Sequence, residues 1–146
     1  MKSIQMIVLL VLCMPVVAKA EIDWNDADIQ WYGYVDGMLA AKRQQKNVIL
    51  VVYADWCSVC KKYSRMFHDP SVISHSDKVV LVRLNQDEDG HYLSKFSLDG
   101  KYVPRTYILN ADFEVQPSPF KSKKYDFYLP PNNVSYLVNL MSSLEK

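Results

Sequence analysis

The chain has 146 residues, of which 49% are hydrophobic and 23% charged, and its formal net charge is +1. This length and composition are typical of one globular domain and exclude a disordered chain. The near-zero charge excludes a strongly basic nucleic-acid-binding protein, and the 4 glycines leave no glycine-rich loop for phosphate.

The beginning of the chain has the pattern of a secretory signal peptide. An apolar run at residues 7–17 has the length of a signal-peptide core and is too short to anchor a protein in a membrane. Ala18 and Ala20 then supply small residues at the two positions that signal peptidase reads. We therefore expect cleavage of residues 1–20 and an exported domain at residues 21–146.

Removal of this segment would change the cysteine count. Cys13 would be lost, and the bulky Leu12 before it argues against a lipid-modified cysteine. The exported domain then keeps only Cys57 and Cys60, in an oxidising environment where thiols are normally paired. Two cysteines so close in sequence enclose too small a loop to stabilise the fold appreciably, which points to a role in a functional site.

The first part of the exported domain combines a tryptophan-rich lead-in with a helix. We expect the lead-in to wrap over the domain surface, with a short strand near residues 29–31 and two large aromatic side chains, Trp24 and Trp31. The spacing of apolar residues predicts a helix over residues 34–45. Its apolar face would carry Val35, Met38 and Leu39.

Two unbroken, largely β-branched apolar runs lie at residues 48–53 and 79–84. Such runs are typical of central strands that are covered on both faces. Between them, residues 57–67 predict a helix. The pair at residues 69–70, Asp-Pro, ends this helix because the residue before a proline avoids the helical conformation.

The C-terminal part predicts a hairpin and a last helix. Strands are expected at residues 106–109 and 113–115, and helical spacing of apolar residues recurs over residues 134–144. Strands separated by helices pair in parallel, whereas the late hairpin adds antiparallel edge strands. The sequence therefore predicts a single α/β domain with a central mixed sheet flanked by helices.

The C-x-x-C motif formed by Cys57 and Cys60 lies between the first buried strand and the second helix. At the N-terminus of that helix, unpaired backbone N–H groups and the positive end of the helix dipole would favour a thiolate on Cys57, which is the nucleophile. Cys60 lies one turn later on the same face and would resolve a mixed disulfide. The neighbouring Lys61 and Lys62 either add positive potential or form an ordinary solvated helix face.

The cysteine pair has three alternative interpretations. Zinc would need two further ligands, and the only candidates are three histidines without paired spacing, His68, His75 and His91. Covalent haem attachment needs a histidine directly after the second cysteine, where this chain has Lys61. A purely structural disulfide is the third alternative. We expect a thiol–disulfide exchange site without a metal ion.

A second candidate element is the Val103-Pro104 pair just before the expected strand at residues 106–109. A cis X-Pro bond there would place backbone groups beside the cysteines, where an extended substrate strand could pair with them. An ordinary trans turn proline is the alternative, and by frequency alone it is the commoner form.

Residues 53–61 resemble the active-site segment of thioredoxins, and residues 101–105 resemble their cis-proline segment. The resemblance is closer to the small thioredoxin-like proteins of the endoplasmic reticulum, the anterior gradient and thioredoxin-domain-containing group, through residues 97–105 and 125–128. It extends to bacterial exported thioredoxin-like domains, including the soluble end of the periplasmic disulfide-reducing transporter.

This resemblance implies a thioredoxin fold with Cys57 as the nucleophile, Cys60 as the resolving cysteine and a cis Pro104. We expect Trp56, Val103 and Pro104 to support the site and bind substrate.

Three features depart from the thioredoxin pattern. Val51 stands where thioredoxins carry a buried acid that moves the proton of the second cysteine. Arg83 replaces a lysine of the following strand and, unlike lysine, does not give up its proton. The pair between the cysteines, usually Gly-Pro, is Ser58-Val59.

The leading hypothesis is an exported thiol–disulfide oxidoreductase that exchanges disulfides with protein substrates through Cys57 and Cys60. The alternative is a non-catalytic chaperone or adaptor that binds client proteins beside Pro104. The enzyme would need no cofactor beyond its own redox-active disulfide. It would act as a monomer on protein substrates and a redox partner, without nucleic acid or membrane. We expect it in the periplasm if the organism is bacterial, and otherwise in the endoplasmic reticulum lumen or secreted.

Overall fold

The computed structural model describes residues 20–145. The predicted signal peptide therefore lies almost entirely outside the described residues, and its cleavage stays a prediction.

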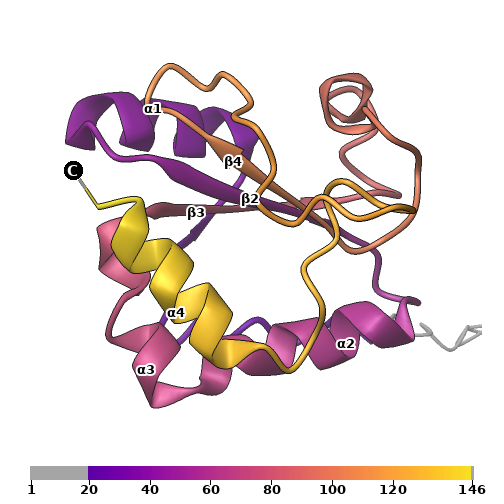
Figure 1. Ribbon diagram of the computed structural model, residues 1–146, viewed down its shortest axis with the longest axis horizontal. Helices are drawn as coiled ribbons and strands as arrows, with labels where there is room; N and C mark the ends of the chain where they lie inside the picture. The colour runs from indigo at the N-terminus through magenta and orange to yellow at the C-terminus, as the bar shows by residue number, and fades with distance from the viewer. Residues whose placement is uncertain (1–19, 146) are drawn as a thin grey trace, which may run out of the picture.

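A four-stranded mixed sheet forms the centre of the molecule (Figure 1). The strands lie in the order β1 (Trp31–Tyr32), β3 (Val80–Asn85), β2 (Val48–Tyr53) and β4 (Arg105–Leu109). β1, β3 and β2 run parallel, and β4 pairs with β2 in the antiparallel sense. The predicted mixed sheet is confirmed, and the first buried run forms a strand with the expected bounds.

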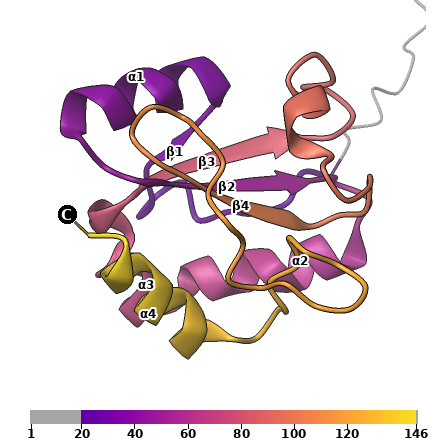
Figure 2. The same ribbon diagram turned by 45° about the horizontal axis from the view of Figure 1, so that its top comes forward.

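Helices cover both faces of this sheet (Figures 1 and 2). One face is covered by α1 (Tyr34–Gln44), and the other by α2 (Ser58–Ser64), α3 (Pro70–Ile73) and α4 (Val134–Ser143). Short 3₁₀ helices lie between these elements, at Arg65–His68, Ser76–Lys78 and Leu93–Phe96. Within residues 20–145, no helix is long and apolar enough to cross a membrane.

Alternate side chains of β2 build two hydrophobic layers, as expected for a strand that is covered on both faces. Ile49 and Val51 pack in the layer under α2 and α4, whereas Leu50 and Val52 pack in the layer under α1. All four side chains are fully buried, and burial of each contributes about 1.5–3 kcal/mol. Because β2 ends directly before the turn that leads to the cysteines, this rigid strand fixes the position of that turn.

The apolar face predicted for α1 is wrong. Val35 and Leu39 are 48% and 56% exposed, and the helix packs on the sheet through small residues, Gly37, Ala40 and Ala41. A Cβ atom at Gly37 would overlap the Cγ2 atom of Val82 on β3. The helix axis therefore lies so close to the sheet that only small side chains fit between them, and the bulky ones face solvent.

The lead-in segment lies on the domain surface, as expected, with Asp23, Asp26 and Asp28 exposed, but its two tryptophans point into the core. The side chain of Trp24 is 1% exposed, and its ring lies 5.0 Å from that of Tyr53 and 5.9 Å from that of Phe67 between centroids. The Trp31 indole is also buried and donates a hydrogen bond to the carbonyl of Trp24 at 2.8 Å. The two tryptophans therefore belong to the core beneath α2.

The helix predicted at residues 57–67 forms as α2 and the 3₁₀ turn that follows it. Asp69 ends this turn, as expected, but it also caps a further short helix. Its carboxylate accepts a hydrogen bond from the backbone N–H of Ser71 at 2.9 Å, and Pro70 takes the first helical position. A proline is suited to that position because its missing N–H would have no helical partner there.

The strand expected at residues 113–115 is wrong. The chain turns back after β4, but only one antiparallel bridge forms, between Leu109 and Val115. Phe113 has a φ of 66°, in the left-handed region that strands do not use. The turn is therefore present without a second strand.

Candidate active site

Cys57 and Cys60 form a disulfide at the start of α2. Their Cα atoms are 5.2 Å apart, within the ordinary range for a disulfide. Cys57 is the N-cap of the helix, and its Sγ accepts a hydrogen bond from the backbone N–H of Cys60 at 3.0 Å. A hydrogen bond of this kind stabilises a thiolate relative to a thiol, so the helix start is prepared for the reduced, charged form of Cys57.

The two sulfur-bearing residues differ in their access to solvent. Cys57 is 5% exposed, whereas Cys60 is fully buried at 0%. Another molecule can therefore reach the site only through Cys57, and Cys60 can react only with its neighbour.

The loop at residues 102–104 lies against Cys57. The carbonyl oxygen of Val103 is 3.7 Å from the Cys57 Sγ, and the Val103–Pro104 peptide bond is cis. Trp56 directly precedes Cys57 and is 63% exposed, and its indole N–H donates a hydrogen bond to the Asp87 carboxylate at 3.0 Å. The structure thus brings the sequence-predicted Trp56, Val103 and Pro104 together around the accessible cysteine.

Asp55 belongs to the thioredoxin-like segment at residues 53–61, although the sequence pattern gives it no role, and it fixes the turn before Cys57. Its side chain is 5% exposed and accepts hydrogen bonds from the Ile22 backbone N–H at 3.1 Å and from the Asn85 side-chain amide at 2.9 Å. The side-chain oxygen of Asn85 in turn accepts from the backbone N–H of Asp87 at 3.0 Å. Because the Asp87 carboxylate holds the exposed indole, one buried carboxylate supports both the cysteine turn and its aromatic neighbour.

A pair of buried hydroxyl groups lies next to the position where thioredoxins carry an acid. Val51 pairs with Thr106 across β2 and β4, so their side chains share one face of the sheet. Tyr63 of α2 reaches the same face, where its hydroxyl lies 2.9 Å from the Thr106 Oγ1. Burial raises the pKa of the Tyr63 hydroxyl well above its ordinary value, so the pair is neutral. Its two members are 43 residues apart, and no local sequence signal marks such a contact.

Arg105 anchors the loop that carries the proline, although its side chain is 0% exposed. Its guanidinium donates hydrogen bonds to the carbonyl of Phe96 at 2.9 Å, to the side chain of Gln86 at 3.3 Å and to the carbonyl of Tyr102. These acceptors belong to three different parts of the long connection between β3 and β4. One buried guanidinium therefore ties together the connection that carries Val103 and Pro104.

A family model described as thioredoxin-like matches residues 30–111, more than half of the chain. The chain belongs to the thioredoxin-like family. Among curated relatives, the thiol:disulfide interchange protein DsbD of Vibrio vulnificus is 41% identical over 54 residues, which cover 34% of this chain and 9% of that protein. Anterior gradient protein 3 of Xenopus tropicalis is 22% identical over 125 residues, which cover 82% of this chain and 73% of that protein. The chain thus matches less than a tenth of the length of that DsbD relative.

Solved structures agree on the fold of this thioredoxin-like chain. DsbH oxidoreductase superposes with a TM-score of 0.59 at 14% identity and covers 92% of both chains. The C-terminal domain of Neisseria meningitidis DsbD superposes with a TM-score of 0.54 at 19% identity, covering 75% of this chain and 91% of that one. The family, the fold and the cysteine pair at disulfide distance support the predicted thiol–disulfide oxidoreductase.

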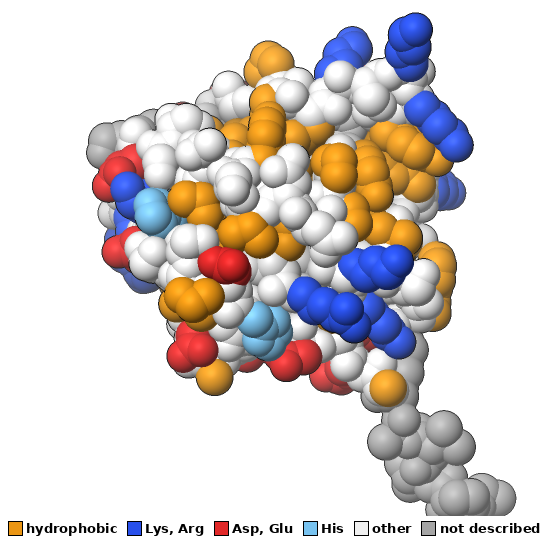
Figure 3. Space-filling view, turned by 60° about the horizontal axis from the view of Figure 1, so that its bottom comes forward, with side chains coloured by type: hydrophobic (Ala, Val, Ile, Leu, Met, Phe, Trp, Pro, Cys, Tyr) orange, Lys and Arg blue, Asp and Glu red, His pale blue; other side chains and the backbone are white. Residues whose placement is uncertain are grey.

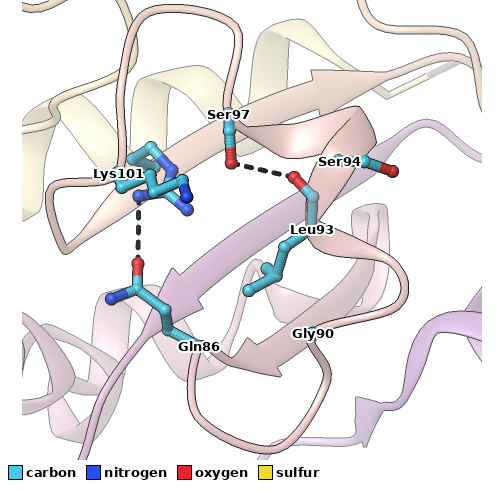
Figure 4. Close-up of a pocket in the computed structure, with 7 residues that line it drawn as sticks. Gln86, Gly90, Leu93, Ser94, Ser97 and Lys101 are labelled. Atoms are coloured by element: carbon cyan, nitrogen blue, oxygen red, sulfur yellow. Dashed lines mark hydrogen bonds between the residues drawn. The ribbon is translucent and has the colours of Figure 1, made fainter.

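A pocket of about 520 Å³ opens beside the buried guanidinium rather than at the cysteines (Figure 4). Figure 4 shows the Gln86 side chain at its edge, hydrogen-bonded to the guanidinium. The pocket is lined by Gln86, Gly90, Leu93, Ser94, Ser97, Lys101 and Arg105. Neither cysteine contributes to this lining, so the pocket is separate from the redox site. In the described part of the chain, no three His, Cys, Asp or Glu side chains are grouped so as to hold a metal ion.

Proposed function

We propose that this protein is an exported enzyme that exchanges disulfides with protein substrates. The observation that carries the proposal is the pairing of an accessible Cys57 with a fully buried Cys60 at a helix start, beside the Val103 carbonyl. The relatives named thiol:disulfide interchange protein support protein redox partners for this chain. The same relatives and the signal-peptide pattern of residues 1–20 support an exported, periplasmic location.

The reduced site would act in two exchange steps. The Cys57 thiolate attacks one sulfur of a substrate disulfide and forms a mixed disulfide, while the other substrate sulfur leaves as a thiolate and takes up a proton. Cys60 then loses its proton and attacks the Cys57 sulfur, which closes the Cys57–Cys60 disulfide and releases the second substrate thiolate. The second substrate thiolate also takes up a proton. In sum, two electrons pass from the cysteine pair to the substrate, and of the two protons that the substrate takes up, one balances the proton lost by Cys60 and the other comes from solvent. The reverse sequence oxidises a substrate dithiol. The protein disulfide is the only redox group that this chemistry requires.

The surroundings of Cys57 would position a substrate segment. A chain lying along the Val103–Pro104 backbone would bring its cysteine to the sulfur, because the Val103 carbonyl is already 3.7 Å from the Cys57 Sγ. The exposed indole of Trp56, the residue directly before Cys57, offers an apolar surface, and its hydrogen bond to Asp87 holds the ring in place.

Cysteine variants test the proposal. Cys60→Ser should accumulate a mixed disulfide with a scrambled substrate protein, because the resolving step is lost. Cys57→Ser should form none and should lose exchange activity. Non-reducing gel electrophoresis and mass spectrometry detect the trapped species. If client binding survives in Cys57→Ser and Cys60→Ser traps nothing, the protein is a binding module and the enzyme proposal fails.

The reduction potential of the cysteine pair gives the direction of electron flow. Equilibration with glutathione buffers, followed by trapping of free thiols, measures it. A value near about −270 mV would mark a reductase, and one near about −120 mV would mark an oxidant that donates its disulfide.

A further inference from the structure

Exposed lysines stand on two elements next to the redox site. Lys61 and Lys62 follow Cys60 on α2, and residues 120–125, here called the lysine loop, carry Lys121, Lys123 and Lys124. On the face covered by α2, α3 and α4, most Lys and Arg side chains gather toward the right of the view, while acidic side chains lie mainly toward the left and below (Figure 3). This separation gives the site a local positive field that the net charge of the chain does not reveal.

A pair of tilted aromatic rings connects the lysine loop to the loop beside the accessible cysteine. The Nζ of Lys124 lies 4.9 Å from the centroid of the Tyr125 ring, and that ring lies 4.2 Å from the ring of Tyr102. Tyr102 directly precedes Val103, whose carbonyl contacts Cys57. The Tyr102 hydroxyl also accepts a hydrogen bond from the backbone N–H of Phe127 at 3.1 Å, which fixes the end of the loop. The lysines therefore lie beside the path that a substrate segment would follow to the sulfur.

Few carboxylates neutralise these cations. Among the described residues, these five lysines form one ion pair, between Lys121 and Asp126 at 3.9 Å, and the Lys121 side chain is 75% exposed. A carboxylate does lie on the Trp56 side of the site, where Asp87 holds the indole. Two carboxylates also lie beside the lysine loop, since Asp99 accepts hydrogen bonds from the Tyr102 hydroxyl at 2.5 Å and from the backbone N–H of Asp126 at 2.7 Å. The five lysines outnumber these carboxylates, so positive charge still predominates beside the lysine loop, whereas an anion lies beside the tryptophan.

We infer that the redox site recognises acidic protein segments, whose carboxylates beside the reacting cysteine meet the lysine loop and the lysines of α2. The inference rests on the proposed function and specifies the substrate class of the same site. Attraction between opposite charges raises the rate of encounter and sets the orientation of the partner. The effect declines with ionic strength because exposed charges are screened.

The shape of the lysine loop favours a protein partner over an anionic membrane. A membrane-binding surface inserts protruding apolar side chains between lipids. The exposed large hydrophobic residues of the described chain all lie outside the lysine loop, at Val35, Leu39, Trp56 and Leu98. Phe120 is half-buried and packs on the core. The loop thus presents charge without an apolar anchor.

Three disulfide-containing peptides test the inference. They are identical except for the residues that flank the cysteine, which are aspartates, serines or lysines. The reduced mature protein is mixed with each, and acid-quenched samples give the second-order exchange rate. At low salt the aspartate peptide should react about ten times faster than the lysine peptide, with the serine peptide between them. The ratio of the aspartate-peptide rate to the lysine-peptide rate should approach one in about 0.5 M salt, where the electrostatic screening length falls to a few ångströms.

Two matched variants locate the effect. Lys123→Gln with Lys124→Gln should lower the rate for the aspartate peptide several-fold and reduce its salt dependence. Lys42→Gln with Arg43→Gln removes the same charge from the last turn of α1 and should leave the ratio between peptides as it is in the parent protein.

The possible failures are distinguishable. Equal rates for the three peptides at low salt would overturn the inference while the exchange itself upholds the proposed function. Absence of exchange with every peptide would overturn the proposed function and the inference with it. Equal rates combined with lysine-dependent binding to vesicles of phosphatidylserine would replace the acidic protein by a membrane surface.

Discussion

The buried hydroxyl pair of Tyr63 and Thr106 predicts a specific pattern of stability losses. Tyr63→Phe leaves the buried Thr106 hydroxyl without its hydrogen-bond partner. Thr106→Val likewise leaves the buried Tyr63 hydroxyl without its partner. Each single substitution should lower the free energy of unfolding by about 1–3 kcal/mol, the cost of a buried polar group without a partner. The double variant leaves neither hydroxyl behind, so its loss should be clearly smaller than the sum of the two single losses.

Urea unfolding of the oxidised protein, followed by tryptophan fluorescence, measures the four free energies. We expect a coupling energy of about 1–2 kcal/mol. Because burial raises the pKa of Tyr63, its hydroxyl stays neutral, and the coupling should be the same at about pH 5 and about pH 9. Thr106→Ser is the matched control, since it keeps a hydroxyl and removes only a methyl group. Strictly additive losses would refute the view that the two hydroxyls form one buried unit.

Three further predictions concern the supporting structure. Gly37→Ala should lower the free energy of unfolding measured in urea, because overpacking against the sheet costs about 1–3 kcal/mol, whereas alanine regains only ~1 kcal/mol of helix propensity. Gly90→Ala is the neutral control, because its added Cβ would meet no atom within 4 Å. Arg105→Met should lower the free energy of unfolding by about 3 kcal/mol, because buried carbonyls lose their hydrogen-bond donor. It should also slow thiol–disulfide exchange with peptides. An unchanged exchange rate would show that the loop holds its place without the guanidinium. Burial raises the pKa of Tyr53 and Tyr107 to about 12, above the ordinary value of 10.0. Their contribution to stability should therefore be fully present below pH 10.0 and lost as the pH rises through about 12; an absorbance titration of the folded protein with a single transition near the ordinary value would contradict this.

The central strands could be predicted because a long apolar β-branched run has few other solutions. The packing of α1 could not, because hydrophobic spacing gives weight to bulky residues such as Val35 and Leu39. The helix instead approaches the sheet so closely that Gly37 meets Val82. Small residues such as glycine and alanine contribute little to a hydrophobic pattern. The sequence pattern therefore does not reveal the contact with the sheet that sets the orientation of the helix.

The reacting part of the site could be predicted because it is local in sequence. Cys57 and Cys60 are one helical turn apart, and the strand before them positions the turn. The supporting polar groups could not, because their partners are distant. Asp55 binds an amide 30 residues away, and the hydroxyls of Tyr63 and Thr106 meet across 43 residues. Such contacts exist only once the strands are in register.

The fold separates reactivity from recognition. The cysteines are fixed by β2 and α2, whose side chains belong to the main hydrophobic core. The surfaces that a substrate would touch lie on irregular segments outside those elements, and each is joined to the core through a buried polar side chain. Asp55 supports the turn with the exposed indole, and Arg105 supports the loop with the Val103 carbonyl. Because these buried side chains hold the two segments through hydrogen bonds, Asp55 and Arg105 determine the geometry of the surface beside Cys57. The hydrogen bond from Cys60 to the Cys57 sulfur, formed within α2, sets the intrinsic reactivity independently of them.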